Sequence, residues 1–529
     1  MIYVVGSGPA GVACAWALVQ QGRQVCLLDA GVELEPERNR VVTQMGAQAP
    51  EAWDAASIAV LKENMASSIK GVPMKYVYGS DYPYRETQPH LPIESAGVDL
   101  MPSFARGGFS AVWGGAMLPY RAEDMQGWPI QRGELDAHYA KVLSFVDYSG
   151  TVDDLAAPFP LYCKSPQFLD PSPQAASLMQ DLARNRERLT KKGIAFGYSR
   201  LAVRVKPTAQ APGCVYCGLC MYGCPYRLIY DSSSTLAVLQ DKPNFRYVKD
   251  VVVRTLSERD GQVRLHAVTR QTGAPIEYTG ERAYLAAGVL STTAMLLQSM
   301  EAYGQPLTMH DSQYFLLPML RLRNTPGVLT QHLHTLAQLF LEITDKRISP
   351  HSIHLQLYTY NDLYRQALKN LSGPLFPLLT LPVKQLLGRL LIAQGYLHSR
   401  ESSAATVQLE PGIGGAPPRL VLTAQRNPGT LKAVWKVVAK LFGSAHLLRA
   451  LPMPLTLYIA KPGRGFHSGG TFPMAQSPAR FQSDLLGRPQ GFQRVHIVDS
   501  TCFPSIPATT ITLSVMANAH RIASAYGDT

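Results

Sequence analysis

Four cysteines lie within an eleven-residue stretch of the chain, and thiols gathered in this way can bind a metal centre. Their spacing, Cys214-x-x-Cys217-x-x-Cys220-x-x-x-Cys224, is that of a bacterial ferredoxin cluster loop. Glycines between them permit the tight turns that bring successive thiolates together. The spacing predicts an iron–sulfur cluster of the 4Fe-4S or 3Fe-4S type, held by all four thiolates or by three and a remote ligand. A structural zinc site and a loop without metal are the less favoured alternatives.

A second chemical motif lies near the N-terminus, where G-x-G-x-x-G occurs as residues 6–11. Gly6 permits a tight turn, Gly8 lets a pyrophosphate approach the backbone, and Gly11 allows a helix to pack closely on a strand. Asp29 lies 23 positions after the first glycine, where a carboxylate accepts hydrogen bonds from ribose hydroxyls. The motif predicts a bound dinucleotide, and by itself it does not separate NAD from FAD.

A strand, a helix and a second strand around this motif must hold its glycine turn in place. A β-branched strand at 2–5 precedes the turn, a helix at 12–21 follows it, and a second strand at 24–28 ends at the acid. The free N–H groups and the positive dipole end of that helix receive the phosphates. Because a core strand begins at residue two, we expect no signal peptide and a cytoplasmic protein.

The composition is that of a globular protein with two or three domains, since 46% of the 529 residues are hydrophobic and 17% are charged. No apolar run approaches the roughly 20 residues of a membrane-spanning helix. The net charge of +12 favours anionic partners, but no finger spacing or basic run with interleaved aromatics indicates nucleic acid. The clustering of half of the eight cysteines favours a metal site over a disulfide framework.

Two further stretches resemble those of a known family. The first is 106–115, RGGFSAVWGG, which is followed by 127–130, GWPI. The second is 467–474, HSGGTFPM, which is followed by 495–499, VHIVD, and 503–507, FPSIP. Together with the N-terminal motif, they resemble the glucose–methanol–choline oxidoreductase family, in its bacterial dehydrogenase branch with a cysteine-rich loop.

The resemblance implies an α/β fold with a discontinuous Rossmann-type FAD-binding domain and an α+β substrate domain built on an antiparallel sheet. FAD-binding segments are implied at 1–150, 245–305 and 461–529, and a cysteine-rich loop at 205–235. The substrate domain is implied at 310–460, where the resemblance fades.

The resemblance also implies a cofactor, FAD, and residues that hold it and act beside it. His467 matches the family's active-site histidine, which takes a hydroxyl proton as hydride leaves for the flavin. The residues implied to bind FAD are Gly6, Gly8, Gly11, Asp29, Gly107, Gly108, Ser110, Gly114, Gly115, Val252, Gly288, Asp499, Thr510 and Ile511.

Thr510 is the main departure from the family pattern. The family usually carries a second His or Asn at this position, whereas a threonine hydroxyl donates a hydrogen bond but is a poor proton acceptor. Either His467 works with Thr509 or Thr510 as a weaker partner, or the chemistry differs from simple alcohol oxidation. We expect His467 and Thr510 to be the catalytic pair.

The middle of the chain shows helix and strand patterns. Residues 352–358 alternate in the manner of a half-buried strand, whereas 371–382 is too rich in proline for a helix. Amphipathic helices are predicted at 383–397 and at about 431–448, both with basic residues beside apolar ones. Such helices are typical of a protein on the inner face of an anionic membrane, and packing on the sheet is the alternative.

These observations predict an FAD-dependent dehydrogenase that oxidises a CH–OH group by hydride transfer to flavin. We expect a small-molecule or lipid-linked alcohol, a sugar or a secondary metabolite as substrate. Electrons would leave through the cysteine loop to a quinone or a protein acceptor. The alternatives are a flavin and iron–sulfur electron-transfer protein that reduces a membrane quinone, and a redox-neutral FAD protein.

Overall fold

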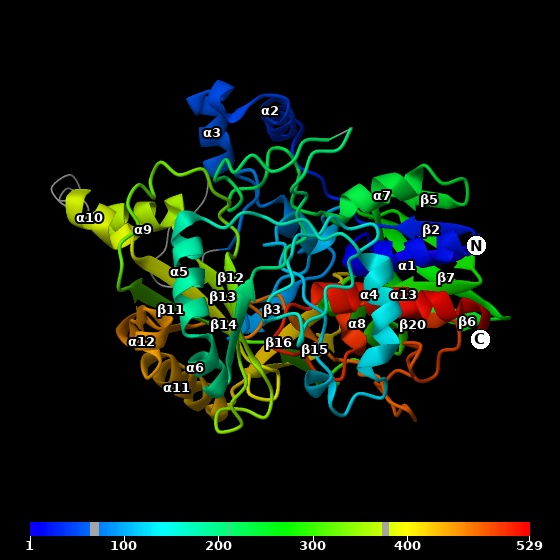
Figure 1. Ribbon diagram of the computed structural model, residues 1–529. Helices are drawn as coiled ribbons and strands as arrows, with labels where there is room; N and C mark the ends of the chain where they lie inside the picture. Colours follow the sequence, from blue (N-terminus) through cyan, green and yellow to red (C-terminus); the bar gives the residue numbers. More distant parts are fainter. Residues whose placement is uncertain (64–73, 210, 373–379, 529) are drawn as a thin grey trace.

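The computed structural model describes residues 1–63, 74–209, 211–372 and 380–528, which are organised around two large sheets (Figure 1). One sheet lies on the right of Figure 1, close to both chain termini, and the other lies on the left.

Within the described residues, the first sheet has parallel strands in the order β20-β9-β1-β2-β5. These strands are β1 (Ile2–Val5), β2 (Val25–Leu28), β5 (Phe245–Val248), β9 (Arg282–Leu285) and β20 (Val495–Ile497). Every residue of β1 and β2 is buried, as expected for a parallel sheet that is covered on both faces. This confirms the predicted Rossmann-type domain, and strands from both ends and the middle of the chain build it.

Helices from distant parts of the sequence cover this sheet. They are α1 (Pro9–Gln20), α4 (Asp136–Val142), α7 (Ser232–Gln240), α8 (Val289–Ser299) and α13 (Thr512–Ser524). Helices α1 and α13 lie side by side, so the two ends of the chain share one hydrophobic core (Figure 1).

The second sheet is antiparallel, with the strand order β17-β11-β14-β13-β12-β4 and with β18 also paired to β11. Its strands are β4 (Ile194–Tyr198), β11 (Tyr314–Arg321), β12 (Leu339–Ile343), β13 (Ile353–Tyr358), β14 (Leu390–Tyr396), β17 (Ala450–Pro452) and β18 (Tyr458–Ile459). The predicted antiparallel sheet is thus present, and β4 joins it from outside the range 310–460.

Helices cover one face of the antiparallel sheet. They are α5 (Pro173–Arg184), α6 (Arg186–Lys191), α11 (Pro428–Phe442) and α12 (Ala445–Leu448). Because neighbouring residues of a strand point to opposite faces, Leu355 and Leu357 enter the hydrophobic core beneath these helices. Gln356 lies between them in β13 and turns to the other face, toward the centre of the molecule.

Two smaller sheets complete the frame. The mixed sheet β19-β10-β15-β16-β3 links the halves, and the antiparallel sheet β6-β7-β8 lies beside the parallel one. Their strands are β3 (Ile93–Ala96), β6 (Val251–Arg259), β7 (Gln262–Thr269), β8 (Pro275–Gly280), β10 (Leu307–Asp311), β15 (Ala404–Glu410), β16 (Arg419–Gln425) and β19 (Ser468–Gly469). Further helices are α2 (Pro36–Gly46), α3 (Ala55–Lys62), α9 (Asp362–Ser372) and α10 (Thr380–Leu387).

The prediction of one helix over 383–397 is wrong, because α10 ends at Leu387 and the strand β14 begins at Leu390. An apolar run of this length is compatible with a helix or with a buried strand. Residues 390–396 form a strand because they pair with β11 on one side and with β13 on the other. Helices α9 and α10 enter the proline-rich stretch 371–382 from either end, and residues 373–379 lie outside the described part. The helix predicted at about 431–448 is confirmed as α11 and α12.

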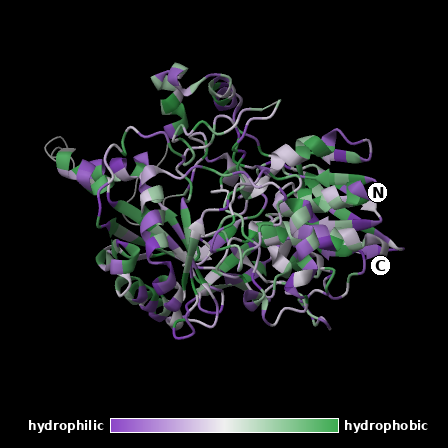
Figure 2. Ribbon diagram, viewed as in Figure 1, coloured by the Kyte–Doolittle hydropathy of each residue, from purple (hydrophilic) through white to green (hydrophobic). Residues whose placement is uncertain are grey.

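Hydrophobic residues concentrate on the strands of both large sheets, and the outer helices are mixed in character (Figure 2). Among the described residues, no helix is long and apolar enough to span a bilayer.

Candidate active site

A cavity of about 440 Å³ runs between the two large sheets. At one end it reaches the turn between β1 and α1, and at the other it lies beneath the uncovered face of the antiparallel sheet. The predicted site residues that line it are Gly6, Gly8, Asp29, Gly108, Ser110, Gly114, Val252, Gly288, His467, Asp499, Thr510 and Ile511. Residues far apart in the sequence are therefore brought to one cavity.

Three predicted glycines lie behind the wall of the cavity. A Cβ atom on Gly11 would meet the carbonyl oxygen of Gly6 at 1.9 Å, which is the close helix–strand contact expected from the motif. Gly107 lies against the carboxylate of Asp231, and Gly115 packs near Ala202. These glycines shape the walls and do not face the space between them.

The nucleotide end of the cavity fits a pyrophosphate. Gly8 caps α1 without any side-chain hydrogen bond, so the first N–H groups of this helix point at the cavity. A Cβ atom on Gly8 would meet no atom within 4 Å, and Gly8 therefore borders open space. The helix dipole favours an anion there, as the FAD pyrophosphate would be.

Asp29 is buried, and its carboxylate already has protein partners. It accepts hydrogen bonds from Ser7 Oγ at 2.6 Å and from Tyr247 Oη at 3.0 Å. Burial raises the pKa of Asp29 to about 6, and the bonds from Ser7 and Tyr247 oppose that rise. The predicted ribose contact must therefore share this carboxylate with two residues that the sequence pattern did not reveal.

Asp499 organises the wall opposite the turn. Its carboxylate accepts hydrogen bonds from the backbone N–H of Gly288 at 2.9 Å and from Thr292 Oγ1 at 2.6 Å. A further bond from the N–H of Thr501 closes the turn after β20. The carboxylate thereby ties the N-terminus of α8 to the end of β20, and both border the cavity.

His467 lies at the inner end of the cavity with its Nδ1 atom buried and, among the described residues, without a hydrogen-bond partner. Its ring stacks on Tyr396 with a centroid distance of 5.1 Å and an interplanar angle of 24°. Burial, and next the charge of His354, lower the pKa of His467 to about 4. The imidazole is therefore neutral at physiological pH and able to accept a proton.

Thr510 borders the same end of the cavity, and its Oγ1 accepts a hydrogen bond from the N–H of Leu118 at 3.0 Å. This bond fixes the hydroxyl and leaves its proton free to be donated. Thr509 Oγ1 is buried and has no partner in the described part of the chain, but Thr509 does not line the cavity. Of the two threonines considered as partners for His467, the geometry favours Thr510.

The uncovered face of the antiparallel sheet supplies residues that the sequence pattern did not single out. Gln356 of β13 and Gln394 of β14 lie directly opposite each other, and both line the cavity. Tyr358 Oη donates to Gln356 Oε1 at 2.9 Å, and Tyr314 and Tyr396 complete this wall. Alternation along the strands was the available signal, because it separates these side chains from the leucines of the core.

The four clustered cysteines line a second, small cavity of about 20 Å³. Burial raises the pKa of Cys214 to about 11 and that of Cys217 and Cys224 to about 12, and negative charge on neighbouring cysteines adds to the rise. All eight cysteines are free of disulfide bonds.

Among the described residues, the four sulfur atoms do not form a group in which all lie within 4.8 Å of one another. A zinc ion held at about 2.3 Å by each thiolate would draw them closer than that.

The cysteine cavity is next to the active-site cavity. Leu336 lines both, and Met221, which follows Cys220, lines the larger one. Lys75 lines the larger cavity and donates to the carbonyl oxygen of Trp113 at 2.8 Å. Burial lowers the pKa of Lys75 to about 8, and the charge of Cys220 partly opposes this change. His334 lines the cysteine cavity.

Comparison with known proteins agrees with this architecture. The N-terminal residues 4–34 match the family model of the NAD(P)-binding Rossmann-like domain. A comparison with curated protein sequences finds no significant match. Solved structures do match along the whole chain, at low sequence identity.

Pyridoxine 4-oxidase from Mesorbium loti is 14% identical, with a TM-score of 0.58 over 100% of this chain and 99% of that one. A formate oxidase from Aspergillus oryzae RIB40, solved in a study of FAD modification, is 15% identical, with a TM-score of 0.61 over 100% of this chain and 98% of that one. The fold is that of the glucose–methanol–choline oxidoreductases. The predicted resemblance is thus confirmed at the level of the fold, and the cavity lies between the Rossmann-type sheet and the antiparallel sheet.

Proposed function

We propose that the protein is an FAD-dependent oxidoreductase that oxidises a CH–OH group of a small-molecule or lipid-linked alcohol. The observation that supports this most directly is the cavity that joins the anion-binding end of α1 to the imidazole of His467, whose Nδ1 has no partner among the described residues. FAD bound there would supply the hydride acceptor. The names of the structural neighbours, a pyridoxine 4-oxidase and a formate oxidase, agree with oxidation of small molecules.

In this proposal His467 is the general base. Its low pKa keeps the ring neutral, so that a ring nitrogen can accept the substrate hydroxyl proton. Stacking on Tyr396 fixes the plane of the imidazole. The Thr510 hydroxyl, held by the N–H of Leu118, orients the substrate oxygen by donating to it.

The wall that the antiparallel sheet gives to the cavity suggests what the substrate looks like. Gln356 and Gln394 offer amide donors and acceptors side by side, and Tyr314 and Tyr396 add aromatic rings. Such a wall suits an alcohol with an apolar or ring-shaped body and further hydrogen-bonding groups.

The test of this function is anaerobic single turnover with candidate alcohols, deuterated at the carbinol carbon. We expect flavin bleaching with a kinetic isotope effect in the native protein, and a rate lower by roughly 10²- to 10⁴-fold in His467→Ala. His332→Gln, which changes an exposed histidine, is the matched control. Equal rates in native protein and His467→Ala would refute the assignment of the base.

We further propose that Cys214, Cys217, Cys220 and Cys224 hold an iron–sulfur cluster that takes electrons one at a time from the reduced cofactor. The ferredoxin spacing of the four cysteines supports the cluster over zinc. The shared wall at Leu336 supports electron exchange between the two cavities. A quinone or a protein would then be the acceptor, in contrast to an oxidase.

Iron and sulfide assays on protein purified without oxygen, together with visible spectra, test the cluster. We expect iron and sulfide in cluster proportion, and their loss in Cys220→Ser. Cys163→Ser, which changes a cysteine outside the loop, should retain both. Zinc, or no metal, in the native protein would make the loop structural and would reopen oxygen as acceptor.

Contact with an anionic membrane surface is the last part of the proposal. The outer side of α11 exposes Leu431, Trp435 and Phe442 in one stripe, next to Lys432, and Leu455 is fully exposed nearby in the sequence. Apolar side chains beside lysines are what such a surface binds.

Co-sedimentation with vesicles tests the membrane contact. We expect binding to vesicles containing phosphatidylserine that falls in Trp435→Ser and Leu455→Ser, and no change in Ile413→Ser, an exposed apolar residue of another loop. Equal sedimentation of all variants would remove the membrane from the proposal.

A further inference from the structure

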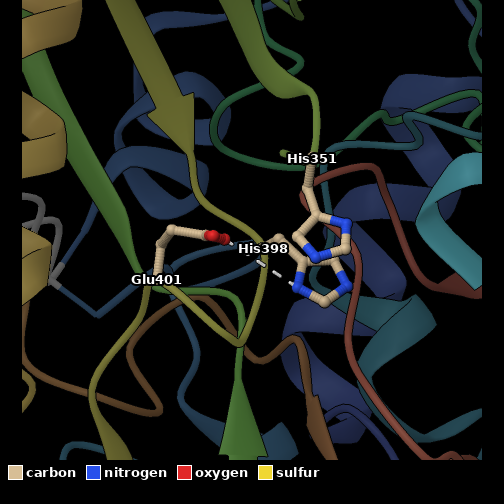
Figure 3. A group of neighbouring side chains, drawn as sticks. All are labelled: His351, His398 and Glu401. Carbon is tan, nitrogen blue, oxygen red and sulfur yellow. Dashed lines mark ion pairs between the residues drawn. The ribbon is translucent and has the colours of Figure 1, made fainter. Parts of the chain in front are cut away.

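The antiparallel sheet brings together three metal-binding side chains at one of its ends. Strands β13 and β14 pair with His354 opposite Tyr396, so the residues just before β13 meet those just after β14. His351 comes from the first segment, and His398 and Glu401 come from the second. Figure 3 shows the two imidazole rings one above the other, with the carboxylate of Glu401 turned toward them.

The donor atoms of these side chains are close. One nitrogen of each histidine and one oxygen of Glu401 all lie within 4.8 Å of one another. Glu401 Oε2 is 3.9 Å from His398 Nδ1. The two rings are stacked, with centroids 3.7 Å apart and planes at 12°. Because an imidazole nitrogen binds a metal in the plane of its ring, one ring must turn about its Cβ–Cγ bond for both to reach the same ion.

The donor atoms are also buried and short of partners. His351 is 3% exposed and His398 is 1% exposed. Within the described residues, neither ring nitrogen of His351 has a hydrogen bond, whereas the ring of His398 faces the backbone of Asp124 and Glu401 faces Ser349. Buried polar atoms are normally satisfied, so the two unpaired nitrogens of His351 indicate that something else completes the site.

We propose that His351, His398 and Glu401 bind a divalent first-row transition-metal ion, with Zn²⁺ as the preferred occupant. Two imidazoles and one carboxylate are a donor set that Zn²⁺ accepts in tetrahedral sites with a fourth ligand from water or protein. The same set suits Fe²⁺ and Co²⁺, whereas Mg²⁺ and Ca²⁺ prefer oxygen ligands alone.

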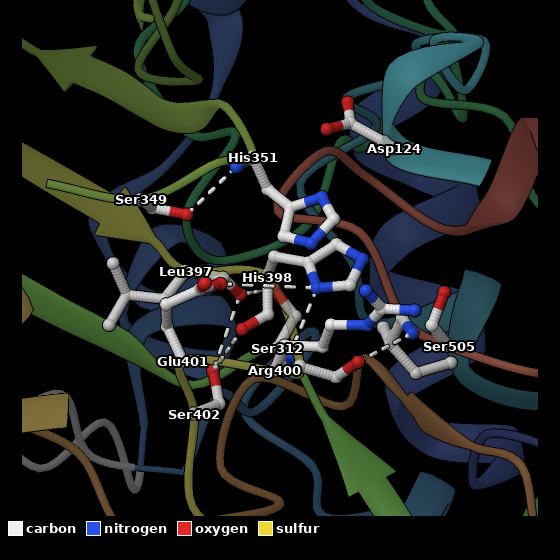
Figure 4. Close-up of polar contacts among 12 residues, drawn as sticks. Asp124, Ser312, Ser349, His351, Leu397, His398, Arg400, Glu401, Ser402 and Ser505 are labelled. Atoms are coloured by element: carbon white, nitrogen blue, oxygen red, sulfur yellow. Dashed lines mark hydrogen bonds and ion pairs between the residues drawn. The ribbon is translucent and has the colours of Figure 1, made fainter. Parts of the chain in front are cut away.

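Polar groups surround the three side chains (Figure 4). The backbone of Asp124 faces the ring of His398, and the Asp124 carboxylate accepts a hydrogen bond from Ser352 Oγ at 3.1 Å. Arg400 and His310 are the nearby basic groups, and Arg400 is exposed to solvent. His398 Nδ1 accepts the N–H of Arg400 at 3.1 Å, and an ion bound at Nδ1 replaces this bond.

An ion here would tie the substrate sheet to the segment that leads into the active site. The turn after His398 is already joined to that segment: the N–H of Ser399 donates to the carbonyl oxygen of Ile506, and Ile506 N–H donates to Ser399 Oγ at 3.0 Å. Thr510 follows four residues after Ile506. The site is closed and distinct from the cysteine loop, so its role is structural.

Metal content and Co²⁺ titration of the full-length protein test the inference. We expect one equivalent of Co²⁺ with the visible d–d bands of nitrogen and oxygen ligands and without a thiolate charge-transfer band. Because changes beside a ligand alone cost 10- to 100-fold in affinity, loss of a ligand in His398→Gln or Glu401→Gln should cost more than about 100-fold. Cys220→Ser and His332→Gln should bind this equivalent normally.

Glu401→Gln is the deciding variant, since Glu401 is half-buried and a change there is the least disruptive of the three. Far-UV circular dichroism reports whether the variant is folded. Folded Glu401→Gln that binds Co²⁺ as tightly as the native protein would overturn the proposal, as would cobalt bands that vanish only in Cys220→Ser. These outcomes are independent of whether any alcohol is oxidised.

Discussion

His354→Gln is the change that tests most sharply how the fold sets the pKa of the base. Glu342 and His354 are both buried in neighbouring strands, and His354 Nδ1 contacts Glu342 Oε1. Tyr396 stacks on His354 at 6.2 Å and on His467 at 5.1 Å between ring centroids. The charge of His354 is the second cause, after burial, of the low pKa of His467.

The expected magnitude follows from these distances. The two centroid distances limit the separation of His354 and His467 to about 11 Å, at which a unit charge contributes about 1.5 kcal/mol at an effective dielectric constant near 20. This corresponds to about one pH unit. Glutamine carries no charge, so His354→Gln should raise the pKa of His467 from about 4 by about one unit.

The assay is the pH dependence of anaerobic flavin reduction by a competent alcohol in stopped flow. The rate needs neutral His467, so it rises with pH through its pKa and levels off above it. In His354→Gln the rising limb should move to higher pH by about one unit, whereas Glu410→Gln, at an exposed ion pair with Arg419, should not move it. An unmoved limb in a variant that retains its flavin would refute the electrostatic coupling of His354 to the base.

The other predictions concern the cradle, acid stability and the threonine. Gly8→Val should leave the fold intact and abolish FAD binding, because its side chain enters open space where a pyrophosphate would lie. Gly11→Val should also prevent folding, because its side chain meets the Gly6 carbonyl oxygen. Flavin fluorescence measures FAD binding and thermal melting measures folding, so together they separate the two variants. His334 and His496 are buried, with pKa values lowered to about 3 and about 4. The free energy of unfolding, measured with urea, should therefore be highest above about pH 6.5 and should fall below it by about 1.4 kcal/mol per pH unit for each histidine. A free energy that does not change with pH would contradict their burial as neutral rings. Thr510→Val should lower the free energy of unfolding by about 1–3 kcal/mol by leaving a backbone N–H unpaired, and Thr510→Ser should restore it.

Sequence reasoning located the nucleotide end of the site better than the substrate end. The glycine turn, Asp29 and His467 lie in motifs where backbone geometry dictates the residue, so local sequence carries the information. Ser7 and Tyr247, which share the carboxylate of Asp29, carry no such signal because their role depends on strand pairing across the chain. Chain folding alone brings such partners together.

The antiparallel sheet shows the same limit. Gln356 and Gln394 are 38 residues apart in the sequence, and only the register of their two strands places them side by side in the cavity wall. The apolar stretch that became β14 has a hydrophobicity that suits a helix equally well, and neighbouring strands on both sides decide its structure. The histidine and glutamate cluster at the sheet end likewise has no sequence motif.

The order of strands in the parallel sheet has a consequence for biosynthesis. Strand β20, near the C-terminus, pairs with β9, while α13 packs on α1 from the other end of the chain. The cradle for the cofactor is therefore incomplete on the ribosome until nearly the whole polypeptide has emerged. Such long-range pairing slows folding, and the hydrophobic surfaces of the N-terminal strands stay exposed until their partners are synthesised. Nascent chains should consequently depend on chaperones, and on the cellular supply of flavin, at the moment of release.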